Sequence, residues 1–339
     1  MTGRPQRYPG SFLPGAPRWR GATNRWPPGM RACVRQRDAA TGVAGVDPPP
    51  PDSDRRGWEI PGRSGRLCQP AVILSRGCTS APRIACQYPD PWRCVAMDSG
   101  GATTITWYGH ACVEMRTSGG TMVLFDPWFA NPMSPKPPES VDRCDVMLVS
   151  HGHADHFGNA LPIASRTRPA WPAIHELALW LASVYAAPDD VIGMNKGGTV
   201  DARGLRVTMT SADHSAGDWD NAAGSPRYLG EPAGFIVELE DGSKVYFAGD
   251  TNVFGDMRLI RDLYAPDLAI LPIGGHYTMG PREAALAVEL LGVAEVVPIH
   301  HGTFPILAGT PDQLRSELAA RSLGEVRVHA PQPGEAITR

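Results

Sequence analysis

The stretch VMLVSHGHADHFGN, residues 146–159, carries the chain's densest group of metal-binding residue types. Three of the ten histidines and one aspartate fall within positions 151–156, directly after an apolar run. Imidazole nitrogens and carboxylate oxygens together are the usual ligands of divalent metals such as zinc. A hydrophilic loop is the alternative, but it gives no reason for so many histidines at this spacing. The stretch therefore predicts a metal site at the end of a strand.

The geometry of a strand would not bring these four side chains together. On an ideal strand His151, His153 and Asp155 share one side, while His156 points to the other. We therefore expect a loop after the strand, with small residues at 152, 154 and 158 leaving room for it. If the loop brings these four side chains together, their spacing suits two adjacent metal ions.

Further residues of the same types follow other predicted strands. His214 lies in SADHSAG, Asp250 in VYFAGDTN, and His300 and His301 in VVPIHHGTFP. Alone, each would be a weak signal, because a single histidine or a GD pair is more often a polar turn residue. Their shared position at strand ends predicts that several loops point at one place.

Short apolar runs bounded by turn residues predict an α/β fold. Strands are indicated at TITWYG, CVEMRT, TMVLFDP, DVMLVS, RVTMTSADH, AGFIVEL, KVYFAGD, LAILPI and EVVPIHH. Helical spacing indicates helices over 172–187, 256–264 and 281–291, the last with Pro281 at its start and Gly292 after its end. Helices covering apolar strands make a layered domain, with strand-end loops free to carry chemistry.

The order H-x-H-x-D-H, a lone histidine, GDT and a late histidine resembles the metallo-β-lactamase superfamily. Within it, TWYGHACVEM, LFDPWFANP, GEPAGFIVE and LPIGGHYTMGPREAA are similar to uncharacterised metal-dependent hydrolases related to ascorbate-6-phosphate lactonase. The resemblance covers about residues 103–310. It implies a four-layer αββα sandwich with a dinuclear site between the two sheets.

The resemblance also implies a ligand set. It assigns His151, His153 and His214 to one metal, Asp155, His156 and His300 to the second, and Asp250 to a bridge between them. The relatives usually have Tyr where this chain has His301, so either late histidine could be the ligand, and the PIH alignment favours His300. Residues near the cleft, either supporting the ligands or contacting substrate, are His110, Asp126, His276, Tyr277 and His301.

The chemistry expected is metal-dependent hydrolysis of a small ester, lactone or phosphoester. Two divalent cations, zinc or else manganese, would bind a bridging hydroxide as the nucleophile, with Asp155 as the catalytic residue that steers the proton. One alternative is a di-iron oxidoreductase on the same fold, against which His153 counts, because those proteins usually carry Glu there. Another is a non-catalytic metal-binding module.

Composition divides the 339 residues into two parts. Residues 1–96 hold 15 Arg, no Lys and 15 Pro, a formal charge of about +9, which leaves about −12 on residues 97–339. We expect 1–96 to be a disordered extension, or to lie upstream of a true start at Met97, and 97–339 to form the hydrolase domain. The acidic domain makes nucleic acid an unexpected partner.

The remaining features predict a cytoplasmic protein that acts on a small-molecule substrate. No apolar run reaches the roughly 18 residues of a membrane span, and no signal peptide is recognisable, so no membrane association is expected. The only cysteines in residues 97–339 are Cys112 and Cys144, which do not have C-x-x-C spacing. We expect both to be buried thiols. A homo-oligomer is compatible with these features.

Overall fold

The first sheet forms from the four apolar runs that lead up to the histidine-rich stretch, together with one strand near residue 337. The computed structural model describes residues 101–220 and 222–339, so the expectations for residues 1–96 and Met97 lie outside it. The sheet has the order β16-β1-β2-β3-β4. Its strands are β1 (Thr104–Trp107), β2 (Val113–Arg116), β3 (Met122–Phe125), β4 (Val146–Leu148) and β16 (Ala336–Thr338). Only β3 and β4 pair in parallel, so both end toward the same edge.

The second sheet contains the other strand ends singled out in the sequence. Its order is β15-β14-β13-β12-β11-β8-β7, parallel from β12 to β15 and antiparallel from β7 to β12. The strands are β7 (Thr199–Ala202), β8 (Leu205–Ser211), β11 (Ala233–Glu238), β12 (Lys244–Phe247), β13 (Leu268–Pro272), β14 (Glu295–Ile299) and β15 (Arg327–Val328).

Side chains along the strands of the second sheet point alternately to its two faces, so each face packs into a separate hydrophobic core. Val245 and Phe247 face the first sheet, whereas Tyr246 between them faces the helices on the other side. The Phe125 and Phe247 rings stack with centroids 4.6 Å apart and join the two sheets. Two sheets packed face to face in this way exclude water from both inner surfaces.

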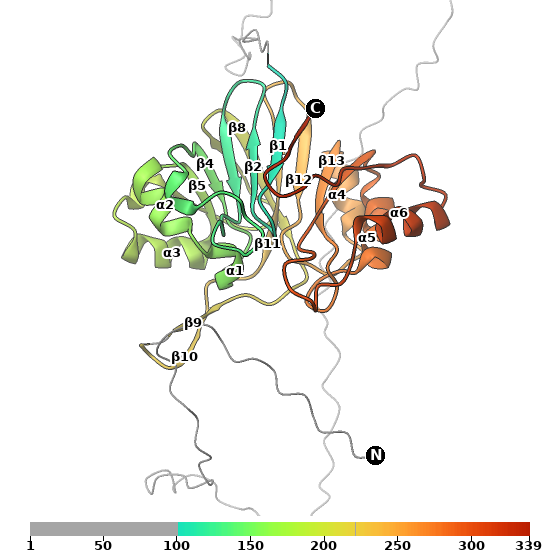
Figure 1. Ribbon diagram of the computed structural model, residues 1–339. Helices are drawn as coiled ribbons and strands as arrows, with labels where there is room; N and C mark the ends of the chain where they lie inside the picture. Colours follow the sequence, from blue (N-terminus) through green and yellow to red (C-terminus); the bar gives the residue numbers. More distant parts are fainter. Residues whose placement is uncertain (1–100, 221) are drawn as a thin grey trace, which may run out of the picture. The chain divides into compact units, whose positions relative to one another are not determined.

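Helices cover the outer face of each sheet, as Figure 1 shows. One side carries α2 (Ala160–Thr167) and α3 (His175–Val184), and the other α4 (Met257–Tyr264), α5 (Pro281–Leu291) and α6 (Pro311–Ala320). The one-turn helix α1 (Ala154–Phe157) lies at the ends of the strands. The expected four-layer αββα sandwich is therefore confirmed. Helix α5 begins at Pro281 and ends before Gly292, whose φ of 65° gives the left-handed cap expected of glycine.

Smaller elements complete the domain and correct one expectation. The helix predicted over 172–187 is shorter, because Trp171–Ile174 forms strand β5, which pairs in parallel with β6 (Val191–Met194). All four residues of β5 are buried, so tertiary packing overrides the helical spacing there. The hairpin of β9 (Asp218–Asp220) and β10 (Ser225–Arg227) and the 3-10 turns Pro138–Ser140 and Pro188–Asp190 make up the rest. Cys112 and Cys144 are buried free thiols, as expected.

Candidate metal centre

The histidine-rich stretch leaves β4 and turns into a one-turn helix rather than the expected loop. Phe157 N donates to His153 O at 2.8 Å, which closes the turn, and Gly158 ends it with a φ of 24°. A Cβ at Gly158 would lie 2.6 Å from the Trp128 side chain, so the chain needs glycine there. The helical turn replaces the strand's alternation and brings Asp155 and His156 to the same region as His151.

The other predicted ligands come from loops at neighbouring strand ends. His214 follows β8, Asp250 follows β12 and His300 follows β14. Strands β12 and β14 run in parallel with β13 between them, so Asp250 and His300 arrive at one edge of the sheet. The structure thus brings all seven residues of the expected ligand set together.

One group of ligand atoms consists of His151, His153 and His214. Their nitrogens lie within 4.8 Å of one another, and His151 Nε2 is 2.8 Å from His153 Nδ1. His151 is buried, whereas His153 and His214 are partly exposed. These are the three histidines that the resemblance to the metallo-β-lactamase superfamily assigns to one metal.

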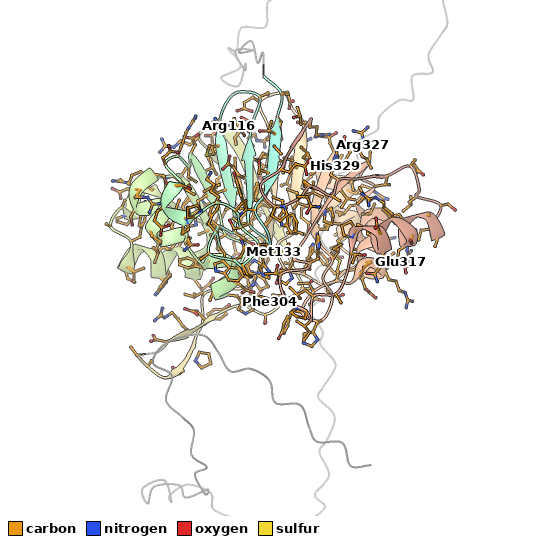
Figure 2. All side chains as sticks on the ribbon, in the orientation of Figure 1. Arg116, Met133, Phe304, Glu317, Arg327 and His329 are labelled. Carbon is orange, nitrogen blue, oxygen red and sulfur yellow. The ribbon has the colours of Figure 1, made fainter. Side chains whose placement is uncertain are left out.

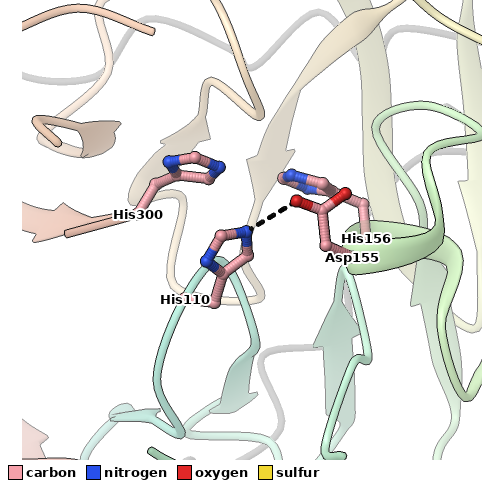
Figure 3. Close-up of side chains that lie close together, drawn as sticks. All are labelled: His110, Asp155, His156 and His300. Atoms are coloured by element: carbon pink, nitrogen blue, oxygen red, sulfur yellow. Dashed lines mark hydrogen bonds and ion pairs between the residues drawn. The ribbon is translucent and has the colours of Figure 1, made fainter. Parts of the chain in front are cut away.

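The second group contains Asp155, His156 and His300, and the structure adds His110 to it. Figure 3 shows these side chains converging from three segments, with His110 Nε2 bonded to Asp155. That hydrogen bond is 3.1 Å long, and the rings of His110 and His300 have centroids only 4.0 Å apart. His110 therefore lies inside the cluster and not merely near it. In this position it could bind a metal or orient Asp155.

Asp250 touches both groups. Its Oδ2 lies 3.6 Å from His214 Nε2, 3.2 Å from His156 Nε2 and 3.1 Å from His300 Nε2. The aspartate is 3% exposed, so water does not screen these contacts. A carboxylate placed between two groups of histidines is suited to bridging two cations.

Several buried atoms of this cluster have no hydrogen-bond partner within residues 101–220 and 222–339. They are His156 Nε2, His300 Nδ1, His300 Nε2 and Asp250 Oδ1. Buried polar atoms are nearly always hydrogen-bonded, and leaving one unpaired costs about 1–3 kcal/mol. Imidazole nitrogens and carboxylate oxygens that face one another in a buried cluster are the donor set a divalent cation needs. The residues present fit a metal.

Asp126 supports both groups from behind. Its carboxylate accepts hydrogen bonds from Ser150 N, Ser150 Oγ and His156 Nδ1, each at 2.7 Å. Since the Ser150 hydroxyl proton points to Asp126, His151 Nδ1 donates to Ser150 Oγ at 2.9 Å. In both histidines Nδ1 thus carries a proton, which leaves Nε2 as the nitrogen that would bind a metal.

Burial and charge shift the pKa values across the cluster. Burial lowers the pKa of His110 to about 4, despite the hydrogen bond to Asp155, and lowers that of His151 well below its usual range. Burial also lowers the pKa of His153 and of His214. These imidazoles are therefore neutral at physiological pH and able to donate lone pairs.

The carboxylates of the cluster stay ionised. Burial would raise the pKa of Asp250, but His156 and His300 hold it well below the usual range. Burial would likewise raise the pKa of Asp155, but the hydrogen bond from His110 and the charges of His156 and His110 together lower it. Burial opposes the charged form of His156, but Asp250 and Asp126 raise its pKa well above normal. The negative charges of these two aspartates beside His156 would favour a cation there as well.

Backbone strain is concentrated in this cluster. His110, Asp126 and His300 have φ angles of 51°, 41° and 53°, in a region that non-glycine residues rarely occupy. Glycine would adopt these conformations more easily, but it offers no imidazole or carboxylate. Strained residues of this kind gather at functional sites, where the side chain is needed in one position.

The remaining sequence candidates lie outside the ligand cluster. The ring of His301 stacks on Trp107 at 4.9 Å, and burial lowers its pKa to about 4. The rings of His276 and Tyr277 pack against each other at 4.4 Å, in the loop before α5, and Tyr277 is exposed. Between the two adjacent late histidines, the geometry favours His300 as the ligand.

Two side chains that the sequence did not single out contact the cluster. Ser150 bonds Asp126 and His151, and Thr303 Oγ1 lies 3.0 Å from His110 Nδ1. Because His110 Nε2 donates to Asp155, its Nδ1 accepts from the Thr303 hydroxyl. Ser150 could have been suspected from its place directly before His151, whereas Thr303 contacts a residue 193 positions away and gave no such signal.

The sequence of the chain matches known hydrolases. The profile of the beta-lactamase superfamily domain matches residues 121–301. A UPF0173 metal-dependent hydrolase of Rubrobacter xylanophilus is 48% identical over 239 residues, which are 70% of this chain and 97% of the relative. The corresponding protein of Herpetosiphon aurantiacus is 44% identical over 239 residues, 70% of this chain and 98% of that protein.

Solved structures share the fold. The metallo hydrolase Igni18 of Ignicoccus hospitalis has a TM-score of 0.62 and 35% identity, covering 70% of this chain and 98% of that one. An isothiocyanate hydrolase from Delia radicum gut bacteria has a TM-score of 0.53 and 20% identity, covering 69% of this chain and 98% of that one. At that lower identity the similarity concerns the fold alone.

Proposed function

Because the chain belongs to the metallo-β-lactamase superfamily, and within it to the UPF0173 metal-dependent hydrolases, we propose that it hydrolyses a small ester, lactone or phosphoester at a dinuclear centre. Zinc is the metal that this set of imidazoles and carboxylates suits best, with manganese as the alternative.

The position of Asp250 carries the proposal. We assign His151, His153 and His214 to one cation, Asp155, His156 and His300 to the other, and Asp250 to both. The Asp250 carboxylate lies within 3.6 Å of nitrogens from each group. Two such cations supply Lewis acidity and lower the pKa of a bound water toward neutrality, so no serine or cysteine nucleophile is needed.

Asp155 is the residue best placed to handle the proton of the attacking water. Its side chain is 39% exposed and lines a cleft of about 430 Å³ beside the cluster, so it reaches both ligands and solvent. His110 fixes the carboxylate by donating from Nε2, and neutral His110 keeps its Nδ1 as an acceptor for Thr303. An ionised, oriented carboxylate can take a proton from water and deliver it to the leaving group.

The metal content of the full chain, purified without chelator, tests the proposal. We expect about two zinc or manganese ions per chain. A His151→Ala/Asp250→Ala variant with unchanged circular dichroism should lose them. Two iron ions would support the di-iron oxidoreductase instead, and no bound metal would reject the assignment.

Activity assays on the metal-loaded chain complete the test. Esters, lactones and phosphodiesters should include at least one substrate whose hydrolysis the same double variant abolishes. Metal binding with no hydrolysis of any of the three classes would favour the non-catalytic module.

We also propose a cytoplasmic location, supported by the two buried free thiols, which are typical of a reducing compartment. Within the described part of the chain, no helix has the length and apolar character to cross a bilayer.

A further inference from the structure

A chain of two hydrogen bonds leads from the turn after His300 to the metal centre. Thr303 Oγ1 lies 3.0 Å from His110 Nδ1, and His110 Nε2 lies 3.1 Å from Asp155 Oδ2. Thr303 and His110 are 9% and 1% exposed, so water competes little for these bonds. Figure 3 shows the second bond, from the His110 ring to Asp155 in α1. Both ring nitrogens of His110 are therefore engaged by protein atoms.

The chemistry of the two partners fixes the direction of both bonds. The ionised carboxylate of Asp155 only accepts, so His110 Nε2 must donate to it. Burial favours the neutral ring, which has a single N–H, so Nδ1 of His110 is left as an acceptor. The Thr303 hydroxyl makes no other hydrogen bond within the described part of the chain, so Nδ1 is the acceptor for its proton. Both bonds are made when His110 carries its proton on Nε2.

The backbone holds His110 in the same place. Its φ angle of 51° lies in the left-handed region, and its carbonyl accepts from Trp107 Nε1 at 2.8 Å and from His300 N at 2.7 Å. The segment after β14 thus contacts His110 twice, through His300 N and through the Thr303 hydroxyl. To turn its ring toward a metal, this strained residue would have to give up at least one of these bonds.

The turn that carries Thr303 is itself closed by hydrogen bonds. Gly302 N donates to Leu307 O at 3.0 Å, and Leu307 N donates to Phe304 O at 2.9 Å. A Cβ added at Gly302 would lie 3.8 Å from Met133 Cε, so the turn packs against Met133. Figure 2 shows Phe304 and Met133 at the same end of the sheets. Thr303 therefore orients the His110 ring from a segment that is held in place.

The hydrogen bond from His110 leaves one oxygen of Asp155 available. Oδ2 accepts the His110 proton, whereas Oδ1 makes no hydrogen bond within residues 101–220 and 222–339. A cation and the His110 N–H therefore need not compete for the same carboxylate oxygen. Residues that orient a ligand side chain in this way affect metal affinity or activity although they touch no metal.

We infer that Thr303 is a positioning residue, which keeps the His110 proton on Nε2 so that His110 orients Asp155 and is not itself a metal ligand. The inference deepens the hydrolase function proposed above and rests on it for its kinetic consequence. A correctly oriented Asp155 can take a proton from a water molecule, and a carboxylate that turns away from that position cannot. Loss of the Thr303 hydroxyl should therefore slow the reaction without removing a metal.

NMR of the isotope-labelled imidazoles in the full chain, with and without zinc, tests the position of the proton. Two-bond proton–nitrogen correlations show which ring nitrogen is protonated, and the His110 signals are those that disappear in His110→Gln. We expect a protonated Nε2 and an unprotonated Nδ1 in both samples. In Thr303→Val the Nδ1 resonance should move to higher frequency, because its hydrogen-bond donor is lost. A protonated Nδ1, an Nε2 that loses its proton when zinc binds, or an Nδ1 resonance that does not respond to Thr303→Val would overturn the inference.

Kinetics of matched variants test the role of the hydroxyl. The probes are p-nitrophenyl acetate and bis(p-nitrophenyl) phosphate, an activated ester and an activated phosphodiester. Thr303→Val replaces the hydroxyl with a methyl group and should keep its metal content and KM but lower kcat about 10–100-fold. Thr303→Ser keeps the hydroxyl and should restore most of kcat. Thr208→Val is the control, because Thr208 is similarly buried and its hydroxyl bonds Thr199 on the second sheet.

Three kinetic results would also overturn the inference. An unchanged kcat in Thr303→Val would mean that the hydroxyl does not act on the reaction. A kcat that falls in step with metal content would mean that Thr303 supports metal binding instead of the orientation of Asp155. A loss of kcat that Thr303→Ser does not restore would assign the effect to packing.

The two readouts separate this inference from the proposed function. A His110 ring protonated at Nε2 and sensitive to Thr303→Val, in a chain that hydrolyses no ester, lactone or phosphodiester, would support the positioning of His110 and reject the proposed hydrolase. Hydrolysis by a chain in which zinc displaces the His110 Nε2 proton would support the hydrolase and reject the positioning role.

Discussion

The buried carboxylate of Asp126 accepts a 2.7 Å hydrogen bond from His156 Nδ1, a residue 30 positions further along the chain. The same carboxylate accepts a hydrogen bond from the Ser150 hydroxyl, and the Ser150 oxygen in turn accepts one from His151 Nδ1. One aspartate thus sets which nitrogen faces the metal in a histidine of each ligand group. Because both ligand groups depend on it, Asp126 is expected to act on metal affinity and not on substrate binding.

Replacing Asp126 with Asn should weaken metal binding. The amide has one oxygen and one NH2 group, so either Ser150 N or both Ser150 Oγ and His156 Nδ1 lose their acceptor. The imidazoles are then held less firmly. We expect zinc affinity, measured by chelator competition, to fall about 10–100-fold. Asp145→Asn is the matched control, because Asp145 bonds Met122 N and pairs with Arg143 away from the site. Equal zinc affinity in both variants would contradict this role.

The adjacent histidines 300 and 301 should behave differently when each is replaced with alanine. His300 lies 3.1 Å from Asp250, whereas His301 stacks on Trp107. His300→Ala is expected to lose about one metal equivalent per chain. His301→Ala should keep both metals and lose only about 1 kcal/mol of unfolding free energy, the scale of one aromatic pair. Metal analysis together with urea unfolding of both variants checks this, and metal loss on replacing His301 alone would reverse the assignment.

How far the sequence could predict the site depends on the kind of residue. The seven expected ligands are chemically conspicuous and follow apolar strands, so their convergence could be anticipated. Ser150 and Thr303 are ordinary polar residues whose contacts with Asp126 and His110 exist only after folding. The one-turn helix α1 was also missed, because four residues are too few to show a helical period.

The fold was predictable to a similar degree and for a similar reason. Strands β12, β13 and β14 are continuous apolar runs and were found. Strand β16 has three mostly exposed residues and forms only because β1 is available to pair with it. Helix α6 was missed although it carries a local signal, the capping box of Thr310 and Gln313.

The stacked pair Phe125 and Phe247 should dominate the stability of the sheet interface. Both rings are fully buried between the sheets, so Phe247→Ala removes a large apolar volume from a close-packed core. We expect a loss of about 3–5 kcal/mol in the free energy of unfolding, measured with urea on metal-loaded protein. Phe304→Ala removes the same atoms from an exposed position and should cost about 1 kcal/mol or less. Similar losses in the two variants would contradict the packing argument.

Glu295 should make a small, pH-dependent contribution to stability. Burial would raise its pKa, but the hydrogen bond from His329 and the charges of Arg339 and Arg327 lower it. A carboxyl with a lowered folded pKa stabilises the protein above its unfolded pKa of about 4.3 and loses this contribution as the pH falls through the folded value.

The effect of Glu295→Gln should therefore depend on pH. We expect a loss of about 1 kcal/mol or less at pH 7, and a smaller difference from the unmodified chain at about pH 3, by urea unfolding. Glu289→Gln, which removes an exposed ion pair with Arg321, is the control. A difference for Glu295→Gln that grows toward low pH would contradict the sign of the shift.

Removing the metals should destabilise the whole domain, because the unpaired atoms of His156, His300 and Asp250 are buried at the junction of the two sheets. A ligand present at 100 times its dissociation constant stabilises the folded state by about 2.7 kcal/mol, so chelation should lower Tm by about 5–10 °C. Calorimetry with and without EDTA measures this shift. In the His151→Ala/Asp250→Ala variant the two scans should coincide, since no site remains to be emptied. If EDTA lowered Tm equally in that variant, the stabilising metal would have to bind elsewhere in the chain.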